Sequence, residues 1–357
     1  MSRKLITIST IMTLMSTSVI ADVPNVAADI APIHSLVSRV MDGVGAPKLI
    51  VQSGASPHGY RLRPSEAKAL QDADHVFWMG EELTPWLDSA IGTLASKASV
   101  TTLLDQQGVI LHDFREGALF EAHDHSAHGD DDHDDHDDHK DHDDHDDHDD
   151  HDDHDDHKDH DDHKDHDDHD DHKDHDDHDD HDDHDDHGSH DPHAWLSPEN
   201  AKLWLNIIAS KLSVSDPENA ATYFMNAAAG QAEIEAMIAE VKATLKPVQG
   251  GKFVVFHDAY QYFENDFDFY TSGAISLGDS SDPSPARIEK VQKRIRDEGI
   301  QCVLAEPQFK KGLVATVMEG SDATASVIDP LGAELETGPK LYTRLIKNMA
   351  KTLRNCL

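Results

Sequence analysis

The chain has 357 residues, with 30 Lys and Arg against 71 Asp and Glu, and a formal charge of −41 at pH 7. Nothing in it resembles the basic patch or stripe that binds nucleic acid, so that class of partner is excluded. Most of the charge lies in one tract, Asp130 to His187, whose 35 Asp, 4 Lys and 19 His give −31. The rest of the chain has the charge of an ordinary globular protein.

The N-terminus has the pattern of an export signal. Arg3 and Lys4 precede a mostly apolar run that ends at Ile20, and residues 19–21 resemble a small-residue cleavage site. This predicts a secretory signal peptide over 1–21, which is excluded from the fold. A membrane anchor is the alternative, but the run is short and broken by Ser and Thr. No cysteine lies near the cleavage point, so we expect a soluble, exported protein without a lipid anchor.

In the N-terminal half, short apolar runs alternate with amphipathic stretches, which is typical of strands followed by helices. Alternation of this kind predicts a parallel sheet with helices on both faces. The expected strands cover 25–30, 47–54, 75–80 and 100–104, and the expected helices cover 33–45, 63–73, 83–95 and 197–212.

The C-terminal half repeats this plan. It supplies about four more strand and helix units, so the chain without its signal and tract holds about 270 residues, about right for two cores. The expected strands cover 252–258, 269–276, 301–307 and 325–332, and the expected helices cover 259–266, 284–299, 310–320 and 339–355.

A long helix is predicted between the halves, over 215–247. Ser215 or Asp216 can cap it, Pro217 suits its first turn, and Glu218 can complete a capping box. Apart from Gly230 nothing interrupts it, so about 30 residues at 1.5 Å each make a rod of about 45 Å. Such a rod would restrict the rotation of one lobe against the other.

The predicted fold class is therefore α/β, with two lobes that are each a roughly four-stranded parallel sheet flanked by helices, joined by the long helix. The predicted domains are the signal peptide at 1–21, the N-terminal lobe at 22–121 and 191–214, a His- and Asp-rich loop at 122–190, the linker helix at 215–247 and the C-terminal lobe at 248–357.

The chain has two cysteines, Cys302 and Cys356. An even pair in an exported protein favours a disulfide, which would stabilise the fold by about 4 kcal/mol in the chain-entropy account. The alternative is a pair of metal ligands. That alternative is weaker because Cys356 is the penultimate residue and no CxxC spacing is present.

Four polar residues stand where ligands of open α/β sheets bind, beyond the carboxyl ends of strands. His58 follows the strand at 47–54, His193 begins the ordered segment after the tract, and His257 and Asp329 end two strands of the second half. Three imidazoles and a carboxylate form a natural tetrahedral set for zinc, and suit Mg²⁺ or Ca²⁺ less well.

Each of the four also has an ordinary structural interpretation. A histidine at a strand end is often only hydrogen-bonded, and Asp329 could cap the last helical region. His34 and His75 are assigned no role. The common placement at strand ends of both lobes is what favours a metal site.

Several stretches resemble one known family: "SGASPHGYRLRPSEAKALQDADHVFWMG", "HDPHAWLSPENA", "VVFHDAYQYF", "LAEPQF" and "IDPLG". They are similar to the periplasmic zinc-binding proteins of ABC uptake transporters, the ZnuA type or cluster A-I, over essentially the whole mature chain. The resemblance implies two α/β lobes joined by a long helix, and a cysteine pair placed like that of this chain.

The resemblance also implies the ligands. It makes His58, His193 and His257 the metal ligands, and His257 indicates zinc because manganese-binding members tend to have a carboxylate there. Asp329 matches an aspartate that some members use, while others leave that place to water or another carboxylate. Some relatives have Glu where this chain has Pro57, so that route is closed.

The same resemblance gives the function and the partners. We expect a non-enzymatic periplasmic protein that captures Zn²⁺ between its lobes, and a monomer. It would deliver the ion to an inner-membrane ABC permease with its ATPase, and a periplasmic zinc chaperone is a further candidate partner.

In the tract, every third residue from His133 to His187 is histidine. In an extended chain with the 3.1 Å rise of polyproline II, neighbouring histidines lie about 9.3 Å apart, too far to share one ion. The tract has no apolar residues to offset ordering, so we expect a disordered collector that binds zinc more weakly than a preformed site. Its first eight histidines, the predicted auxiliary ligands, are His133, His136, His139, His142, His145, His148, His151 and His154.

Other interpretations stay open. The tract could be a solubilising spacer. The chain could be a manganese-binding homologue, a zinc buffer or an exported zinc hydrolase, since three histidines with an open position can activate water. The hydrolase would need a general base, and no HExxH motif is present.

Overall fold

The computed structural model describes residues 23–115, 190–276, 283–308 and 311–357. The predicted signal peptide and the Asp130–His187 tract lie outside the described residues. The described segments form two four-stranded sheets, each wholly parallel, and the fold class is confirmed.

The first sheet has the order β2-β1-β3-β4 and the second has the order β6-β5-β7-β8. In each, the strand that comes first in the chain is central, so crossovers run to both sides. The strands are β1 (Val26–Ala28), β2 (Lys48–Leu49), β3 (His75–Trp78), β4 (Ser99–Thr102), β5 (Phe253–His257), β6 (Ala274–Ser276), β7 (Cys302–Ala305) and β8 (Thr324–Val327).

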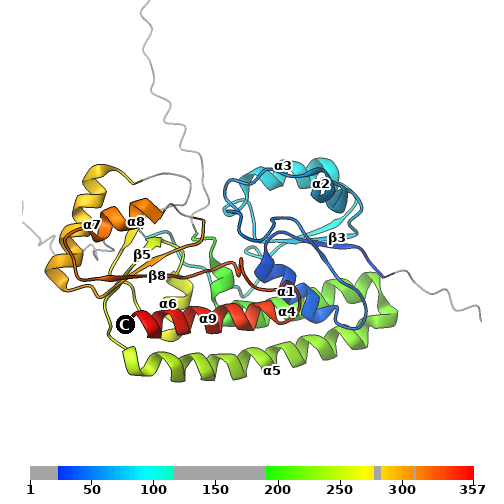
Figure 1. The fold of residues 1–357 in the computed structure, drawn as a ribbon. Helices are drawn as coiled ribbons and strands as arrows, with labels where there is room; N and C mark the ends of the chain where they lie inside the picture. Colours follow the sequence, from blue (N-terminus) through cyan, green and yellow to red (C-terminus); the bar gives the residue numbers. More distant parts are fainter. Residues whose placement is uncertain (1–22, 116–189, 277–282, 309–310) are drawn as a thin grey trace, which may run out of the picture. The chain divides into compact units, whose positions relative to one another are not determined.

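Helices cover both faces of each sheet, as Figure 1 shows. On the first sheet α2 and α3 pack on one face and α1 on the other; on the second, α7 and α8 lie opposite α6 and α9. The helices are α1 (Ala31–Val40), α2 (Pro64–Gln71), α3 (Pro85–Leu94), α4 (Pro198–Ser215), α5 (Ala220–Leu245), α6 (Gln261–Phe267), α7 (Pro285–Glu298), α8 (Lys311–Met318) and α9 (Leu341–Cys356).

Local sequence explains where several of the helices begin and end. Pro stands in the first turn of α1, α2, α3, α4 and α7, where its missing N–H costs nothing. Ser197 and Ser284 cap α4 and α7 by accepting a backbone N–H three residues on. Gly299 ends α7 with φ +64°, a left-handed conformation that glycine adopts without strain.

The long helix is present, with a different start from the predicted one. Ser215 belongs to the last turn of α4, and Asp216 caps a short 3₁₀ turn, Pro217–Asn219, that leads into α5. A second 3₁₀ turn, Lys246–Val248, follows the end of α5. The 26 residues of α5 give the helix a length of about 39 Å.

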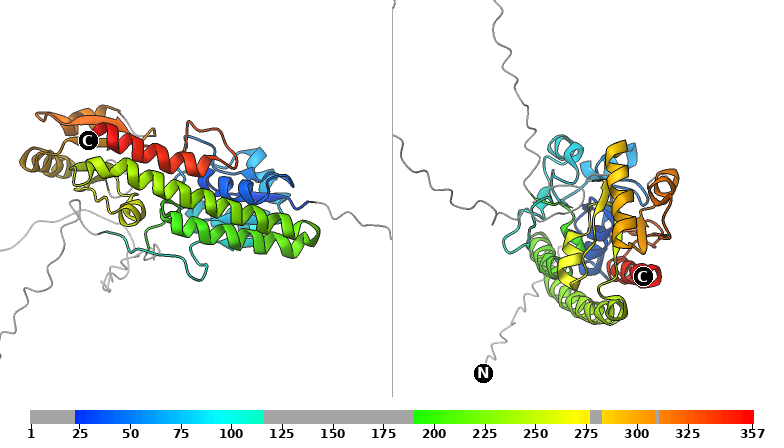
Figure 2. Two further views of the ribbon diagram at one scale, coloured as in Figure 1. Left: turned by 90° about the horizontal axis from the view of Figure 1, so that it is seen from below. Right: turned by 90° about the vertical axis from the view of Figure 1, so that its left-hand side faces the viewer.

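A stripe of buried residues at helical spacing attaches α5 to the rest of the fold. Figure 2 shows α4, α5 and α9 side by side, as their contacts require. Gly230 lies in this stripe because a β-carbon there would come 2.9 Å from the Leu205 side chain of α4. The stripe consists of Tyr223, Ala227, Gly230, Ile234, Met237, Val241 and Leu245.

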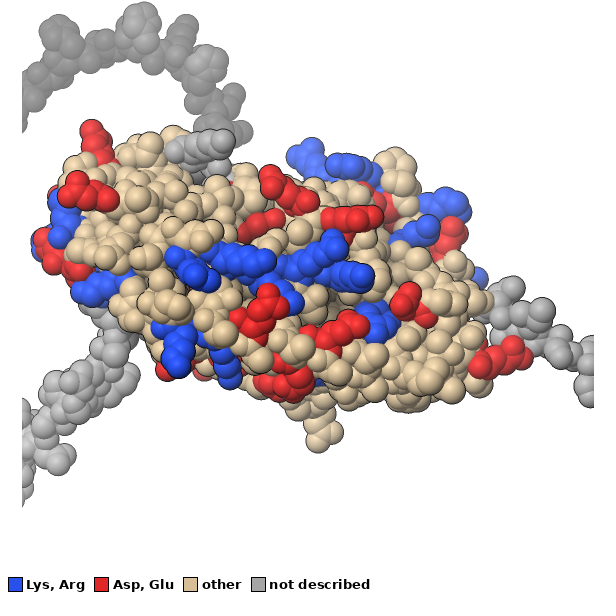
Figure 3. Space-filling view, turned by 60° about the horizontal axis from the view of Figure 1, so that its bottom comes forward, with Lys and Arg blue, Asp and Glu red and all other residues tan. Residues whose placement is uncertain are grey.

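The outer side of α9 is basic. Arg344, Lys351 and Arg354 are exposed there, and Lys347 pairs with Glu240 of α5. Figure 3 shows a row of Lys and Arg side chains on the face turned to the viewer, with Asp and Glu on both sides of it. A basic row therefore lies between acidic side chains on this face.

Cys302, the first residue of β7, is bonded to Cys356 at the end of α9. The disulfide predicted from the even cysteine count is confirmed. It fastens the last helix of the chain to the second sheet. Among the described helices, none combines the length and the apolar character that a membrane crossing needs.

Candidate metal centre

His58 lies in the loop between β2 and α2. Hydrogen bonds hold the loop before and after His58. The indole Nε1 of Trp86 donates to the Pro57 carbonyl at 2.7 Å, and the Tyr60 hydroxyl donates to Glu66 at 2.8 Å. Glu66 also accepts the Arg63 N–H, which closes the first turn of α2. The first turn of α2 therefore holds this loop in place.

His193 immediately precedes a short 3₁₀ turn, Ala194–Leu196, and is 4% exposed. Its Nδ1 lies 2.6 Å from Oδ1 of Asp191, and its backbone N–H donates to the same oxygen at 3.0 Å. Asp191 is itself placed by Tyr262 of α6, whose hydroxyl donates to the Asp191 carbonyl at 2.7 Å. The indole N–H of Trp195 donates to the Pro330 carbonyl, which ties this segment to the second lobe.

His257 is the last residue of β5, a central strand of the second sheet, and is 4% exposed. Its Nδ1 faces Oε1 of Glu306 at 3.6 Å. Glu306 follows β7, the neighbouring strand, so both side chains leave the same edge of the sheet. Glu306 is 3% exposed, and its Oε2 accepts from the Gln308 amide at 2.6 Å.

Oε1 of Glu306 has no hydrogen-bond partner among the described residues. The hydroxyl of Tyr260 is buried nearby. Burial raises the pKa of Tyr260 well above its ordinary value, and the charge of Glu306 and a weak side-chain interaction with that carboxylate add to the rise. The phenol therefore stays protonated beside a carboxylate that also faces His257.

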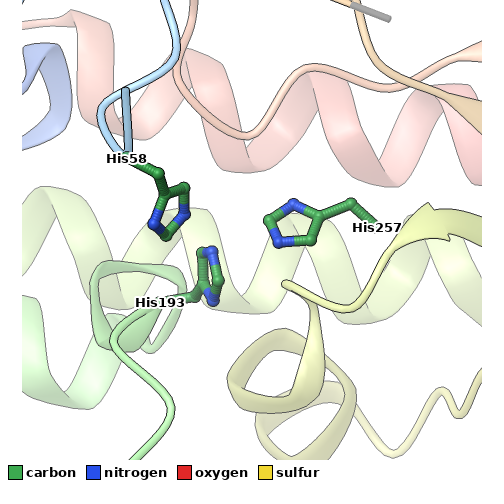
Figure 4. Close-up of side chains that lie close together, drawn as sticks. All are labelled: His58, His193 and His257. Atoms are coloured by element: carbon green, nitrogen blue, oxygen red, sulfur yellow. The ribbon is translucent and has the colours of Figure 1, made fainter. Parts of the chain in front are cut away.

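The three imidazoles converge. Each offers a nitrogen, and these three atoms all lie within 4.8 Å of one another, the one such group of His, Cys, Asp or Glu among the described residues. Figure 4 shows the three rings turned toward a common point. Their centroids are 5.5 Å apart for His58 and His193, 5.8 Å for His58 and His257, and 4.9 Å for His193 and His257.

The space between the rings suits one ion. The cavity there measures about 10 Å³, about the smallest space that can hold a single water molecule. Tetrahedral zinc with 2.0–2.1 Å bonds needs its nitrogens about 3.3 Å apart. Small movements of the rings would bring them to that spacing, whereas an organic molecule would not fit.

Asp329 has other partners. Its Oδ1 accepts the N–H groups of Leu331 and Gly332 at 3.0 and 2.8 Å, and its Oδ2 accepts that of Ala333 at 2.6 Å. Burial raises the pKa of Asp329, and these three bonds act against that rise. The carboxylate shapes the loop after β8 and is not part of the three-histidine group, so its role as a fourth ligand stays a prediction.

The histidines without an assigned role are structural neighbours of the backbone and of hydroxyl groups. His34 lies 3.2 Å from the Pro47 carbonyl, and His75 lies 2.7 Å from the Ser215 hydroxyl. Burial lowers the pKa of both. The predicted auxiliary histidines, His133 to His154, lie outside the described residues.

Asp191 and Glu306 were not among the predicted site residues. A signal for each is present: Asp191 stands two residues before His193, and Glu306 follows a strand that neighbours the one carrying His257. Carboxylates at such positions are within reach of a histidine. Which of the chain's many carboxylates is buried against an imidazole depends on contacts such as that of Tyr262 with Asp191, 71 residues apart.

Comparison with known proteins gives one family. The sequence model described as "ZnuA: Zinc-uptake complex component A periplasmic" matches residues 26–356. The high-affinity zinc uptake system protein ZnuA of Brucella abortus (strain 2308) is 46% identical over 332 residues, covering 93% of this chain and 91% of that protein. The protein of the same description from Paracoccus denitrificans (strain Pd 1222) is 42% identical over 338 residues, covering 94% and 93%.

The fold is also found among solved structures. A crystal structure of ZnuA has a TM-score of 0.66 at 19% identity, covering 94% of this chain and 99% of that chain. At that identity the likeness concerns the fold alone, and it is the sequence matches that carry the assignment. The family expected from the motifs is thus confirmed: the chain belongs to the ZnuA family, the periplasmic component A of zinc-uptake complexes.

Proposed function

We propose that the chain captures one Zn²⁺ between its lobes with His58, His193 and His257. The observation that carries this is the convergence of three imidazoles, from three separate segments, on a cavity that fits one ion. Imidazole is a borderline donor that suits zinc, whereas manganese prefers oxygen ligands. The three-nitrogen set therefore favours zinc over manganese.

The ligands come from both halves of the chain. His58 and His193 precede α5 and His257 follows it, so an ion bound by all three links the two lobes. We propose that drawing the nitrogens together on zinc orders this region, and that a membrane permease recognises the loaded form. A zinc-uptake complex of this family implies an ABC permease and an ATPase as partners; a periplasmic zinc chaperone and a monomeric state are our further proposals.

The Asp130–His187 tract has a separate role in this proposal. It binds zinc at many weak sites and so raises the concentration of the ion near the three-histidine site. The tight site, in contrast, is the one built by folded segments of the two lobes. Asp329 remains the proposed fourth ligand only if its loop gives up backbone bonds to the carboxylate.

The ligand set is tested by single alanine substitutions at His58, His193 and His257 in the full chain. Zinc affinity is measured by competition with a chelator of known affinity, which isolates the tightest site from the weak ones. Each substitution should weaken the tight site more than about 100-fold, beyond the effect typical of losing a ligand's supporting partner. His34→Ala and His75→Ala, which also remove buried histidines, are the matched controls and should leave the affinity unchanged.

The same titration with Mn²⁺ as competitor distinguishes the manganese-binding alternative. A large excess of Mn²⁺ should fail to displace zinc from the tight site. Displacement at similar concentrations of the two metals would favour a manganese protein instead.

A further inference from the structure

Two of the three imidazoles are backed by a buried carboxylate, one in each half of the chain. Asp191 lies behind His193 and Glu306 lies behind His257, and all four side chains are nearly inaccessible to water. A metal-binding histidine commonly gives its second N–H to such a group, which fixes the ring and the nitrogen that binds.

The contact with Asp191 determines which ring nitrogen of His193 carries the proton. An ionised carboxylate can only accept hydrogen bonds, so the 2.6 Å contact requires the proton of His193 to be on Nδ1. Nε2 then carries the lone pair and is the nitrogen available to a metal. Since Oδ1 also accepts the His193 backbone N–H, the ring and its own backbone are held by one oxygen.

Glu306 and His257 are arranged in the same way as Asp191 and His193, but their contact is longer. The 3.6 Å between Oε1 and Nδ1 of His257 exceeds the hydrogen-bond range by about 0.4 Å. Oε1 is buried, lacks a hydrogen-bond partner among the described residues, and belongs to a side chain on the wall of the zinc-sized cavity. A buried charge in this condition is unfavourable until a positive group approaches it.

The charges of Asp191 and Glu306 also matter for binding a cation. The Asp329 carboxylate accepts three backbone N–H groups. Oε1 of Glu306, in contrast, accepts no hydrogen bond from the described residues. Two carboxylates behind neutral imidazoles supply two negative charges, which offset the two positive charges of a divalent cation. Glu306 is the member whose charge the ion, or an imidazole polarised by it, would offset most.

We propose that Glu306 and Asp191 are the positioning residues of the site: they orient His257 and His193 with Nε2 toward the ion, and Glu306 offsets the ion's charge. This rests on the proposed function for its metal, but its first test is made without metal. Neither carboxylate is proposed as a ligand.

The test uses the ¹⁵N spectrum of histidine side chains in the metal-free full chain, which reports which ring nitrogen carries the proton. The signals of His193 and His257 are those that disappear in His193→Gln and His257→Gln. In the native chain both should be protonated on Nδ1. A His257 ring protonated on Nε2 would overturn the proposal for Glu306, and the same result for His193 would overturn it for Asp191.

Two substitutions of Glu306 separate orientation from charge. Gln retains one acceptor oxygen without the charge, and the Gln308 amide competes for that oxygen, so Glu306→Gln should keep part of the preference for Nδ1 and weaken zinc binding about 10-fold. Leu removes both, so Glu306→Leu should also lose the preference for Nδ1 and weaken zinc binding about 100-fold. Unchanged spectra and affinities within twofold in both variants would overturn the proposal.

Asp216→Asn is the matched control. Asp216 is a buried carboxylate bonded to Asn219 and Tyr223, and it contacts none of the three histidines in these hydrogen bonds. Its loss should leave both ring spectra and zinc affinity unchanged even if the fold is weakened. Zinc bound elsewhere than at the three histidines would end the proposed function, while the metal-free spectra would still decide the roles of Glu306 and Asp191.

Discussion

The guanidinium of Arg115 lies against the carboxylate of Asp258, the residue that follows His257, and also donates to Glu264 of α6 at 2.7 Å. All three side chains are largely buried. Arg115 is the last described residue before the segment that carries the tract. This ion-pair cluster therefore holds Arg115 against Asp258, the residue next to the proposed ligand His257.

Replacing Arg115 with Met should destabilise the fold by about 3–5 kcal/mol, since it leaves two buried carboxylates without their cation. Burial already raises the pKa of both Asp258 and Glu264, so in the variant they are protonated more readily. The loss should therefore be larger at pH 8 than at pH 5. Urea unfolding of the metal-free chain at the two pH values measures it.

Arg39→Met is the matched control, because Arg39 pairs with Glu233, whose side chain is half exposed. That loss should be below about 1 kcal/mol. Equal losses for Arg115→Met and Arg39→Met would show that the buried cluster stabilises the fold no more than a half-exposed ion pair does.

Asp29 should make the stability of the N-terminal lobe depend on pH. Burial raises the pKa of Asp29 to about 7, although its oxygens accept the N–H groups of Ile30 and Met79 at 2.7 Å. Because the folded pKa lies above the unfolded value, the folded state binds the extra proton, and stability falls as pH rises from about 4 to about 7.

Asp29→Asn removes this titration. Between pH 4 and pH 8 the free energy of unfolding should shift in favour of the variant, relative to the native chain, by up to about 4 kcal/mol. The measurement is urea unfolding of both proteins across that range. Parallel pH profiles would mean that Asp29 does not titrate in the folded state as described.

The disulfide should stabilise the C-terminal lobe without affecting the metal. Cys302 and Cys356 are 54 residues apart in sequence, and a loop of that length corresponds to about 4 kcal/mol. The double substitution to Ser should lower the free energy of unfolding by about that amount. Zinc affinity of the folded variant should stay within twofold; a tenfold loss would show that the cysteine pair supports the site directly.

Deleting Asp130–His187 should leave one tightly bound zinc per chain. The three histidines lie outside the deleted tract and are positioned by folded segments, so their affinity for zinc should persist. Total zinc bound at high concentration should fall, because the weak sites are gone. Metal analysis after gel filtration counts the tight ion, and its loss on deletion would refute the collector hypothesis.

The alternation of short apolar runs with amphipathic stretches was enough to predict the eight strands among the described residues and the helices between them. Each unit buries its own apolar face locally, so the periodicity is visible in the sequence. Boundaries were less predictable: β2 is only Lys48–Leu49, although Ile50 and Val51 continue to bond to the backbone of β1 and Asp29. Of the two predicted caps of the long helix, Ser215 was wrong because it completes α4, whereas Asp216 caps the 3₁₀ turn that leads into α5.

For the site, placement at strand ends pointed to His58, His193, His257 and Asp329 together, and the family resemblance named the three histidines as ligands. In a parallel sheet the carboxyl ends of the strands lie at one edge, and the predicted alternation of strands and helices already implies parallel sheets. The supporting carboxylates were not predictable in this way. Asp191 and Glu306 are two of 71 acidic residues, and burial against an imidazole depends on contacts distant in sequence.

The most direct test of the central claim is anomalous diffraction at the zinc edge from crystals of the full chain loaded with one equivalent of zinc. The account predicts one strong peak within bonding distance, about 2.0–2.1 Å, of a nitrogen of each of His58, His193 and His257. An empty three-histidine pocket, with the zinc peak at any other residues, would contradict it.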